Sequence, residues 1–319
     1  MKPTKLLGQG LAQFMEHRGR RIVEAGGVLW HETESRMYMS VPYTLTPKVS
    51  HEELDNLLRR VNGSGVRYPS QTEPGLPGGI YVCQTRDYSL SAVQSRLRSM
   101  VRKGLQQCEV KPVTEEVMIR EGIQLNRDTM GRQGRFDSEF GDPEQWANLC
   151  RAIGKSPKVK AMGSFVDGYL AAYAILYEED GWTHFLHQNS RLDLLDHYPN
   201  HALAYTVTSE SLARPGIEGV SYGLKSLVNT AGLHDFKLRI GFECQEQNAV
   251  CHLHPALAPM LTSGLAVWSL KKLRELRAED QRIERIEAVV TAARAARLAS
   301  AAKPVRVEAP GKRVHEEAA

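Results

Sequence analysis

The residues best suited to chemistry lie in the stretch Phe-Lys-Leu-Arg-Ile-Gly-Phe at positions 236–242. Lys237 and Arg239 stand two residues apart there, between a predicted strand at 220–224 and another at 244–253. Positive charge beside a pocket could bind an anionic donor or stabilise the negative charge that develops during acyl transfer. The same pair also fits an exposed helix end, where cations interact favourably with the carbonyl dipoles. The local sequence leaves both interpretations open.

Two further polar side chains are candidates for the same chemistry. Tyr222 could donate a hydrogen bond from the end of its strand, or it could simply pack against the sheet. His187 stands near the end of a predicted strand at 182–188 and could accept a proton from an attacking amine. A single histidine at a strand end is more often a hydrogen-bonded structural residue.

Basic and metal-binding side chains elsewhere have competing interpretations. Arg98 and Arg102 belong to a basic stretch at 96–103 that could bind phosphates or form a solvated helix face. His252 and His254 share one face of a predicted strand, but no second ligand pair at zinc-like spacing accompanies them, so we expect no metal site. The chain has no Gly-x-Ser-x-Gly elbow and no Cys/His pattern typical of a covalent nucleophile. Direct attack of a substrate amine on a bound acyl donor is therefore the simpler mechanism.

Composition narrows the class of protein. The 319 residues suffice for one large domain or two smaller ones, and no apolar run approaches membrane-spanning length. The five scattered cysteines and the absence of a signal peptide predict reduced thiols and a cytoplasmic location. From Lys271 onward the chain has 12 Lys/Arg and 8 Asp/Glu, which accounts for the whole net charge of +4. The preceding part is neutral overall, which argues against a general nucleic-acid binder.

The elements that must position these residues follow from local patterns. Ser50 and Glu53 form a predicted capping box, Asp167-Gly168 predicts a tight hairpin, and Gly104 is expected to end a helix. Predicted strands cover 28–30, 37–41, 66–68, 80–84, 109–113, 159–166, 169–177, 182–188, 220–224 and 244–253, with a Pro/Gly-rich loop at 74–79. Predicted helices cover 50–61, 91–104, a segment opened by Thr114, 142–153, 199–213 and the region around Phe236. This order predicts an α/β (α+β) fold with a mixed central sheet flanked by helices.

The C-terminal part has a different composition. Leu276, Ile283 and Val290 recur every seven residues, which predicts a long helix through about residue 302. Asp280 and Glu287 interrupt the seam, so a helix that lies on the body or pairs weakly with a partner is favoured over a strong coiled coil. Residues 303–319 are predicted to be disordered.

Several motifs occur in order between about residues 90 and 255. They are LRSMVRKG at 97–104 with Cys108-Glu109-Val110, GSFVDGYLAAY at 163–173, YPNHAL at 198–203, YGL at 222–224 and the terminal FK…GF at 236–242. Their order and spacing resemble the GNAT acyltransferase superfamily and, more narrowly, its FemAB-like branch. The resemblance implies a GNAT-like domain at 89–260, preceded by an N-terminal α/β part at 1–88. One interpretation of that part is the degenerate half of a doubled GNAT-like fold. A long charged C-terminal helix at 261–302 and a tail at 303–319 complete the expected organisation.

The same resemblance implies roles for individual residues. Lys237 would stabilise charge during acyl transfer to an amine, and Phe236 would shape the donor site. Asn189 and Arg191 belong to the segment 187–200, which stands where ordinary GNAT enzymes hold the coenzyme A pyrophosphate on a glycine-rich loop. That segment contains no glycine, and FemAB-like proteins that build peptidoglycan use aminoacyl-tRNA. Acyl-CoA is the expected donor, and an acyl carrier protein or aminoacyl-tRNA, hence tRNA as a partner, stays an alternative.

We therefore predict an N-acyltransferase that moves an acetyl or aminoacyl group to an amine on a small molecule or peptide. The catalytic candidates are Lys237, Tyr222 and His187, and the donor- or substrate-binding candidates are Phe236, Arg239, Asn189, Arg191, Arg98 and Arg102. The alternative is a non-catalytic protein of the same fold whose C-terminal helix binds a partner. An open cleft from Tyr222 to Lys237 would favour the enzyme, and a filled one would favour the binding protein. The acyl group, the acceptor and the oligomeric state stay open.

Overall fold

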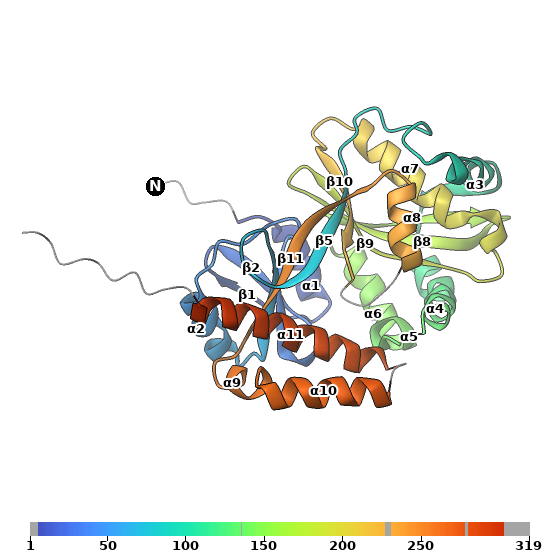
Figure 1. Ribbon diagram of the computed structural model, residues 1–319. Coiled ribbons are helices and arrows are strands. Elements are labelled where there is room, and N and C mark those ends of the chain that lie inside the picture. Colours follow the sequence, from blue (N-terminus) through green and yellow to red (C-terminus); the bar gives the residue numbers. More distant parts are fainter. Residues whose placement is uncertain (1–5, 135, 227–230, 278–279, 303–319) are drawn as a thin grey trace, which may run out of the picture.

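A single mixed sheet of eleven strands forms the centre of the molecule (Figure 1). The computed structural model describes residues 6–134, 136–226, 231–277 and 280–302, so the predicted tail at 303–319 lies outside the described residues. The strands are β1 (Ile22–Ala25), β2 (Val28–Glu32), β3 (Met37–Val41), β4 (Gly65–Ser70), β5 (Leu76–Cys83), β6 (Glu109–Pro112), β7 (Val159–Val166), β8 (Tyr169–Glu179), β9 (Trp182–Ser190), β10 (Gly219–Leu224) and β11 (Glu243–Leu253).

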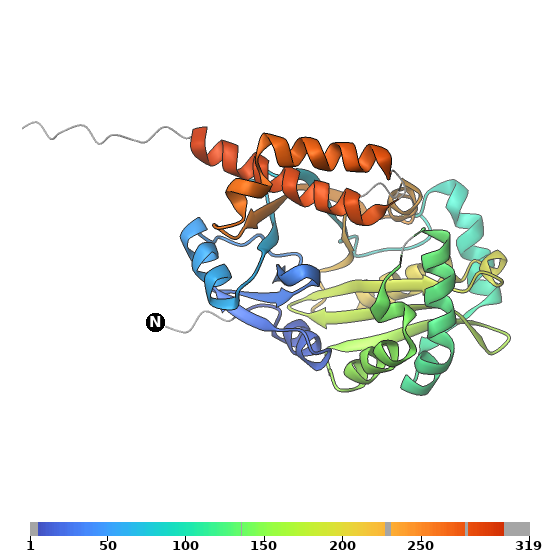
Figure 2. The same cartoon turned by 90° about the horizontal axis from the view of Figure 1, so that it is seen from below.

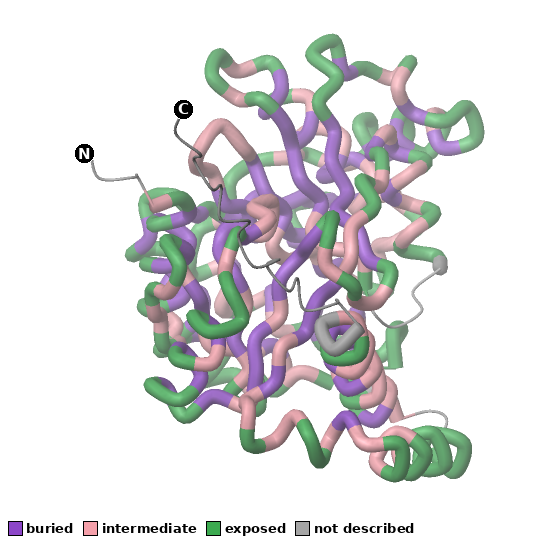
Figure 3. Tube along the Cα trace, turned by 60° about the vertical axis from the view of Figure 1, so that its left-hand side comes forward, coloured by how far each residue is buried: buried purple, intermediate pink, exposed green. Residues whose placement is uncertain are grey.

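Helices surround this sheet, and a buried interior runs through the molecule (Figure 3). The strands β4, β5, β7 and β8 are buried along most of their length. The α-helices are α1 (Gln9–His17), α2 (His51–Val61), α3 (Ser95–Gln107), α4 (Glu115–Arg132), α5 (Ser138–Gly141), α6 (Pro143–Gly154), α7 (Pro199–Ala213), α8 (Ala231–Arg239), α9 (Ala258–Leu261), α10 (Gly264–Leu276) and α11 (Gln281–Ala302). The predicted mixed sheet flanked by helices is thus confirmed. Within the described residues, no helix is both long and apolar enough to cross a membrane.

The arrangement of the strands is nearly symmetrical about the central β11–β5 pair. The strand order runs β1-β2-β3-β4-β11-β5-β10-β9-β8-β7-β6. β3 is parallel to β4 and β9 is parallel to β10, and a helix, α2 or α7, connects each parallel pair. The central strands β11 and β5 are antiparallel to each other and to their outer neighbours β4 and β10. The first half, β1–β4, and the strands β7–β10 of the second half therefore repeat one arrangement on either side of the β11–β5 pair, and β6 adds an edge strand beside β7.

Local signals position several elements as predicted. The capping box at Ser50 and Glu53 begins α2, with each side chain accepting a hydrogen bond from the backbone N–H of the other residue. Asp167 and Gly168 both have positive φ, 49° and 83°, and form the tight turn between β7 and β8. The capping box thus fixes where α2 begins, and the turn fixes where β7 ends and β8 begins.

Each half of the sheet is covered on both faces. In the second half, Tyr173 and Ile175 of β8 pack in a cluster with α1, α4 and α6, and Leu176 packs on the other face with α3 and α7. In the first half, Tyr68 packs with α2, and Cys251 of β11 packs with α11. Successive side chains of a strand point to opposite faces of the sheet, so neighbouring residues pack against different sets of helices.

Some element boundaries differ from those predicted. The helix expected at 91–104 is α3, which begins at Ser95 and continues past Gly104 to Gln107. Gly104 does not end the helix, because a Cβ there would lie 2.7 Å from the carbonyl oxygen of Tyr198, so this glycine allows α3 and the start of α7 to pack closely. β5 begins at Leu76, inside the segment expected to be a loop. Neither α1 nor β1 was predicted.

The predicted long C-terminal helix is confirmed as α11, which ends at Ala302 as expected. It does not extend back to residue 261; α10 precedes it as a separate helix, and the two helices form a pair. Ile283 and Val290 of the heptad pattern are buried in α11, which packs against β11 and β5, whereas Leu276 at the end of α10 is 83% exposed. The pair lies along one side of the molecule, in orange and red in Figure 2. The division of the chain near residue 88 stays a prediction, and β11 from the later part of the chain lies between β4 and β5 of the earlier part.

Candidate functional site

The candidate site lies where two parallel strands diverge. β9 and β10 pair over only three residues, from Trp182↔Gly219 to His184↔Ser221. Tyr222 follows directly after the last pair, and β10 then bonds only to β5 on its other side, with a register irregularity between Ser221 and Leu224. Backbone groups and side chains of both strands can therefore line this divergence.

Lys237 is a buried cation at this divergence. It projects from α8, is 6% exposed, and its Nζ donates a hydrogen bond to the carbonyl oxygen of Tyr222 at 2.7 Å. The same Nζ lies 4.4 Å from the ring centre of Tyr81 and 5.0 Å from that of Tyr222, within cation–π range. Burial lowers the pKa of Lys237 to about 8. No described carboxylate forms an ion pair with it.

Aromatic side chains fill the space between the diverging strands. The Tyr222 ring lies 4.3 Å from that of Phe185 and 5.2 Å from that of Phe242, and its hydroxyl donates to Oε1 of Gln188 on β9 at 2.5 Å. Phe236 lies 6.3 Å from Tyr222, measured between ring centres. Tyr222 is only 6% exposed. Among the described residues, the hydrogen bond from Tyr222 to Gln188 thus bridges the divergence, and both Tyr222 and Lys237 are almost fully buried.

Four residues of this site were missed by sequence reasoning. Tyr81 of β5 stacks on the Lys237 ammonium, and its hydroxyl lies 2.7 Å from Nδ1 of His234. His201 in the first turn of α7 lies 5.2 Å from Phe236, and its buried Nδ1 has no hydrogen-bond partner among the described residues. Burial lowers the pKa of His201 to about 4, so it is neutral at neutral pH. His201 lay in the motif YPNHAL and Gln188 in the segment 187–200, but sequence reasoning gave neither a role; Tyr81 and His234 had no signal.

The structure brings together Lys237, Tyr222 and Phe236, but it places the candidates His187 and Asn189 of β9 elsewhere. His187 lies with its ring 4.5 Å from that of Phe140, in contact with the helices of the opposite face. Asn189 is buried on that same face and donates to Oδ1 of Asn126 at 2.7 Å. Catalytic or binding roles for His187 and Asn189 stay predictions, and any such role belongs to the opposite side of the sheet from Lys237.

The predicted arginines also lie apart from Lys237, each with its own surroundings. Arg239 is at the exposed end of α8, 3.5 Å from Asp235. Arg191 forms a surface ion pair with Asp193. Arg98 of α3 donates to the carbonyl oxygen of Val93 at 2.7 Å, and Arg102 is exposed on the same helix. Binding roles for all four stay predictions.

The start of α7 offers few free N–H groups to a phosphate. Its first residue is Pro199, which has no N–H, and the N–H groups of His201 and Ala202 both donate to the carbonyl oxygen of Tyr198. Tyr198 has a left-handed backbone conformation, with φ 57°, and caps the helix with no side-chain hydrogen bond. A glycine-rich phosphate cradle needs several N–H groups aimed at the anion, and this turn lacks that arrangement.

Metal binding has no support from the arrangement of potential ligands. His252 instead bonds Asp55, with Nε2 and Oδ1 2.7 Å apart. Across residues 6–302, apart from the gaps in the description, no group of three His, Cys, Asp or Glu side chains is placed to hold a metal ion.

Comparison with known proteins identifies the fold. No family model matches the chain, and no curated protein matches it in sequence. Among solved structures, FemX matches with a TM-score of 0.55 at 13% identity, covering 79% of this chain and 93% of that one. The C-terminal domain of a putative lysylphosphatidylglycerol synthetase from Agrobacterium fabrum matches with a TM-score of 0.50 at 11% identity, covering 75% of this chain and 85% of that one. The protein therefore has the GNAT/FemAB-like fold that the sequence motifs predicted.

Proposed function

We propose that this protein is an N-acyltransferase in which Lys237 stabilises the oxyanion of the tetrahedral intermediate. The observation that carries the proposal is a buried ammonium with no described carboxylate partner, held at the divergence of β9 and β10. A buried unpaired cation is costly in free energy. Such a cost is expected where the positive charge has a functional role, such as meeting negative charge that appears only during a reaction.

The chemistry needs only an amine, an acyl donor and a positioned cation. The amine nitrogen attacks the acyl carbonyl and forms the new N–C bond. The C–S or C–O bond to the donor then breaks, and the proton of the amine passes to the leaving thiolate or alkoxide. At neutral pH Lys237 is mostly protonated, because its pKa of about 8 lies above the pH. Its ammonium can therefore offset the oxyanion charge while proximity supplies much of the rate.

The donor is an acyl-CoA or an aminoacyl-tRNA. FemX and GNAT proteins share the fold, which supports both classes equally. The first turn of α7 favours the second class, since Pro199 has no N–H and the N–H of His201 is already bonded. A coenzyme A pyrophosphate would find a poor cradle there. Either donor must displace Tyr222, so opening of its hydrogen bond to Gln188 is part of the proposed binding step.

Transfer assays with both donor classes test the proposal. The full chain is incubated with acetyl-CoA or with charged tRNA and a panel of amino acids and short peptides, and acylated amines are detected by mass spectrometry. Wild type should transfer from one donor class, and Lys237→Met should reduce the rate by about 100-fold or more, the usual effect of removing an oxyanion donor. Lys155→Met, at the exposed end of α6, provides the matched control and should keep the wild-type rate. Undiminished transfer by folded Lys237→Met, or no donor binding at all, would disprove the role.

A non-catalytic binding protein is the second candidate, and the filled divergence favours it. Tyr222 and Lys237 are each 6% exposed, so the described residues leave no open cleft to the ammonium. Leu265, Trp268 and Leu276 of α10 are between 58% and 83% exposed, which provides apolar surface for a partner. Replacing the exposed Leu265 and Trp268 of α10 by serine distinguishes the two functions without removing α11, whose buried residues pack against β11. If the protein is an enzyme, the variant should still bind and use the acyl donor. If it is a binding protein, the variant should lose binding of its partner.

A further inference from the structure

The divergence of β3 and β4 differs from its counterpart in the second half. β3 and β4 pair over three residues ending at Arg67, just as β9 and β10 pair over three residues ending at Ser221. Tyr68 therefore corresponds in position to Tyr222. Tyr222 bonds across to β9, but the hydroxyl of Tyr68 donates to Glu73, in the turn that follows its own strand, at 2.9 Å. The first-half divergence is thus left without the hydrogen bond that closes the second-half one.

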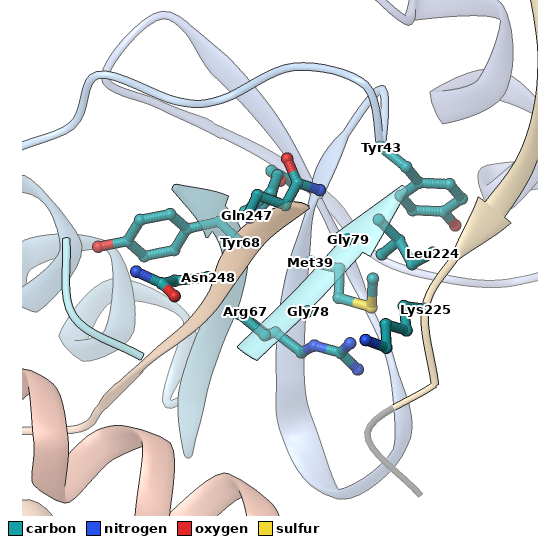
Figure 4. A pocket seen from close by; sticks show the side chains of 13 residues that line it. Met39, Tyr43, Arg67, Tyr68, Gly78, Gly79, Leu224, Lys225, Gln247 and Asn248 are labelled. Atoms are coloured by element: carbon teal, nitrogen blue, oxygen red, sulfur yellow. The ribbon is translucent and has the colours of Figure 1, made fainter. Parts of the chain in front are cut away.

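A pocket lies at this first-half divergence (Figure 4). Met39 and Tyr43 line it from the first half, Gly78 and Gly79 from β5, and Lys225 from the end of β10. Its lining contains no aspartate or glutamate. Because Gly78 and Gly79 carry no side chains, the β5 backbone itself forms part of the wall.

Two cations face this pocket without a compensating anion. The guanidinium of Arg67 is partly buried and forms no hydrogen bond or ion pair with another described residue. Burial lowers the pKa of Arg67, as expected for a desolvated cation. The ammonium of Lys225 likewise has no ion-pair partner in the described part of the chain, and Figure 4 shows both charged groups directed into the same space. Neighbouring like charges repel, so an anion between them would be stabilised.

This pocket is separate from the site at Lys237. Arg67 of β4 is the cross-strand partner of Cys251 of β11, so the two side chains lie on the same face of the sheet. Cys251 packs against α11 on that face. Lys237 lies against Tyr81 and Tyr222, which belong to the cluster formed with α3 and α7. On β5, Tyr81 and Ile80 point to opposite faces because strand side chains alternate. An anion held by Arg67 is thus on the other face from the Lys237 ammonium.

We propose that the pocket at the divergence of β3 and β4 binds an oxyanion, a carboxylate or a phosphate group of a small-molecule ligand, through Arg67 and Lys225. The planar guanidinium can hold two oxygen atoms at once, and the ammonium adds a point charge. Arg67 belongs to β4 and Lys225 directly follows β10, so the bound anion links the two halves of the sheet. Assigning the ligand to the acceptor of acyl transfer rests on the proposed function; the binding itself does not.

Ligand-dependent unfolding of the full chain tests the site. Thermal unfolding is followed during titration with sodium phosphate, with sodium succinate and with sodium chloride at matched ionic strength. We expect a saturable rise in Tm with phosphate, with succinate or with both, beyond that with chloride. Lys225→Gln and Arg67→Gln should each raise the Kd by about tenfold or more, the effect of losing one charge-assisted hydrogen bond. Lys155→Gln, on the exposed end of α6, should bind as wild type does.

The outcomes distinguish a phosphate ligand from a carboxylate ligand. They also distinguish this oxyanion site from the proposed acyl transfer at Lys237. A response to phosphate alone assigns a phosphorylated ligand, a response to succinate alone assigns a carboxylate, and a response to both assigns their shared chemistry. No saturable response beyond chloride would overturn the site, as would wild-type affinity in folded Lys225→Gln, which avoids any folding defect caused by replacing Arg67. Lys237→Met should keep oxyanion binding, because Lys237 does not line the pocket. Failure of acyl transfer and failure of this site are therefore distinguishable.

Discussion

Replacing Lys237 by methionine should raise the stability of the protein at neutral pH while removing its activity. The ammonium is 6% exposed and lacks a described carboxylate partner, so folding transfers a charge out of water. Methionine has a similar length and no charge, and the rings of Tyr81 and Tyr222 can pack against its thioether. Such a gain is typical of functional residues whose burial is unfavourable for folding.

The magnitude follows from the pKa of Lys237. Folding lowers that pKa from 10.5 to about 8. At about 1.4 kcal/mol per pKa unit, charge burial costs roughly 3 kcal/mol of unfolding free energy at pH 7. Because the folded pKa is the lower one, the unfolded state binds more protons between pH 8 and 10.5, and stability rises with pH across that window. The variant also loses the hydrogen bond to Tyr222, worth about 1 kcal/mol, so its net gain at pH 7 should be about 2 kcal/mol.

Urea unfolding of both proteins at pH 7 and pH 10 measures this difference. The advantage of Lys237→Met over wild type should shrink by about 2 to 3 kcal/mol from pH 7 to pH 10, because the wild-type lysine loses its proton in the folded state. Comparing the two proteins at each pH cancels the titration of all other groups. A variant that is less stable at pH 7, or a difference that does not change with pH, would refute the view that Lys237 is a desolvated cation.

Two further substitutions test packing and electrostatics away from the site. Gly104→Ala should lower the unfolding free energy by about 1 to 3 kcal/mol, because its Cβ would lie 2.7 Å from the carbonyl oxygen of Tyr198; the control Gly131→Ala meets no atom within 4 Å and should gain up to about 1 kcal/mol from helix propensity in the same thermal unfolding experiment. Glu139→Gln should cost about 1 to 2 kcal/mol in urea unfolding, since Glu139 and Arg18 form a partly buried ion pair at 2.5 Å that joins α5 to the residue after α1. Unchanged stability in Gly104→Ala or in Glu139→Gln would contradict the corresponding contact.

Local sequence signals predicted most of the secondary structure. Ser50 and Glu53 begin α2, Pro199 begins α7, and Asp167-Gly168 forms the β7–β8 turn, because each signal acts within a few residues of the backbone it fixes. Errors occurred where distant contacts decide. Gly104 continues its helix because α7 approaches it closely, and β5 starts before Gly78 because β11 supplies its hydrogen bonds.

The candidate site was predicted only in part, because sequence motifs identify residues that lie close together in the chain and not those that the fold brings to them. Lys237, Phe236 and Tyr222 lie within fifteen positions of one another, so a motif in one stretch of sequence could identify them together. Tyr81 comes from a strand more than 150 positions earlier, and no local pattern indicates that its ring lies on the Lys237 ammonium. His187 was placed correctly on β9 but faces the opposite side of the sheet.

The sequence by itself determined the turns, the caps, most strands and the order of motifs that indicates a GNAT/FemAB-like fold, because these depend on interactions between near neighbours in the chain. Only the tertiary structure decided that β11 lies between β4 and β5, that Tyr222 closes one divergence while Arg67 and Lys225 face the other, and that Lys237 is buried without a described carboxylate. Strand pairing and burial join residues that are far apart in sequence. The pKa of a buried side chain such as Lys237, and the reaction it can support, depend on neighbours that only the folded chain provides.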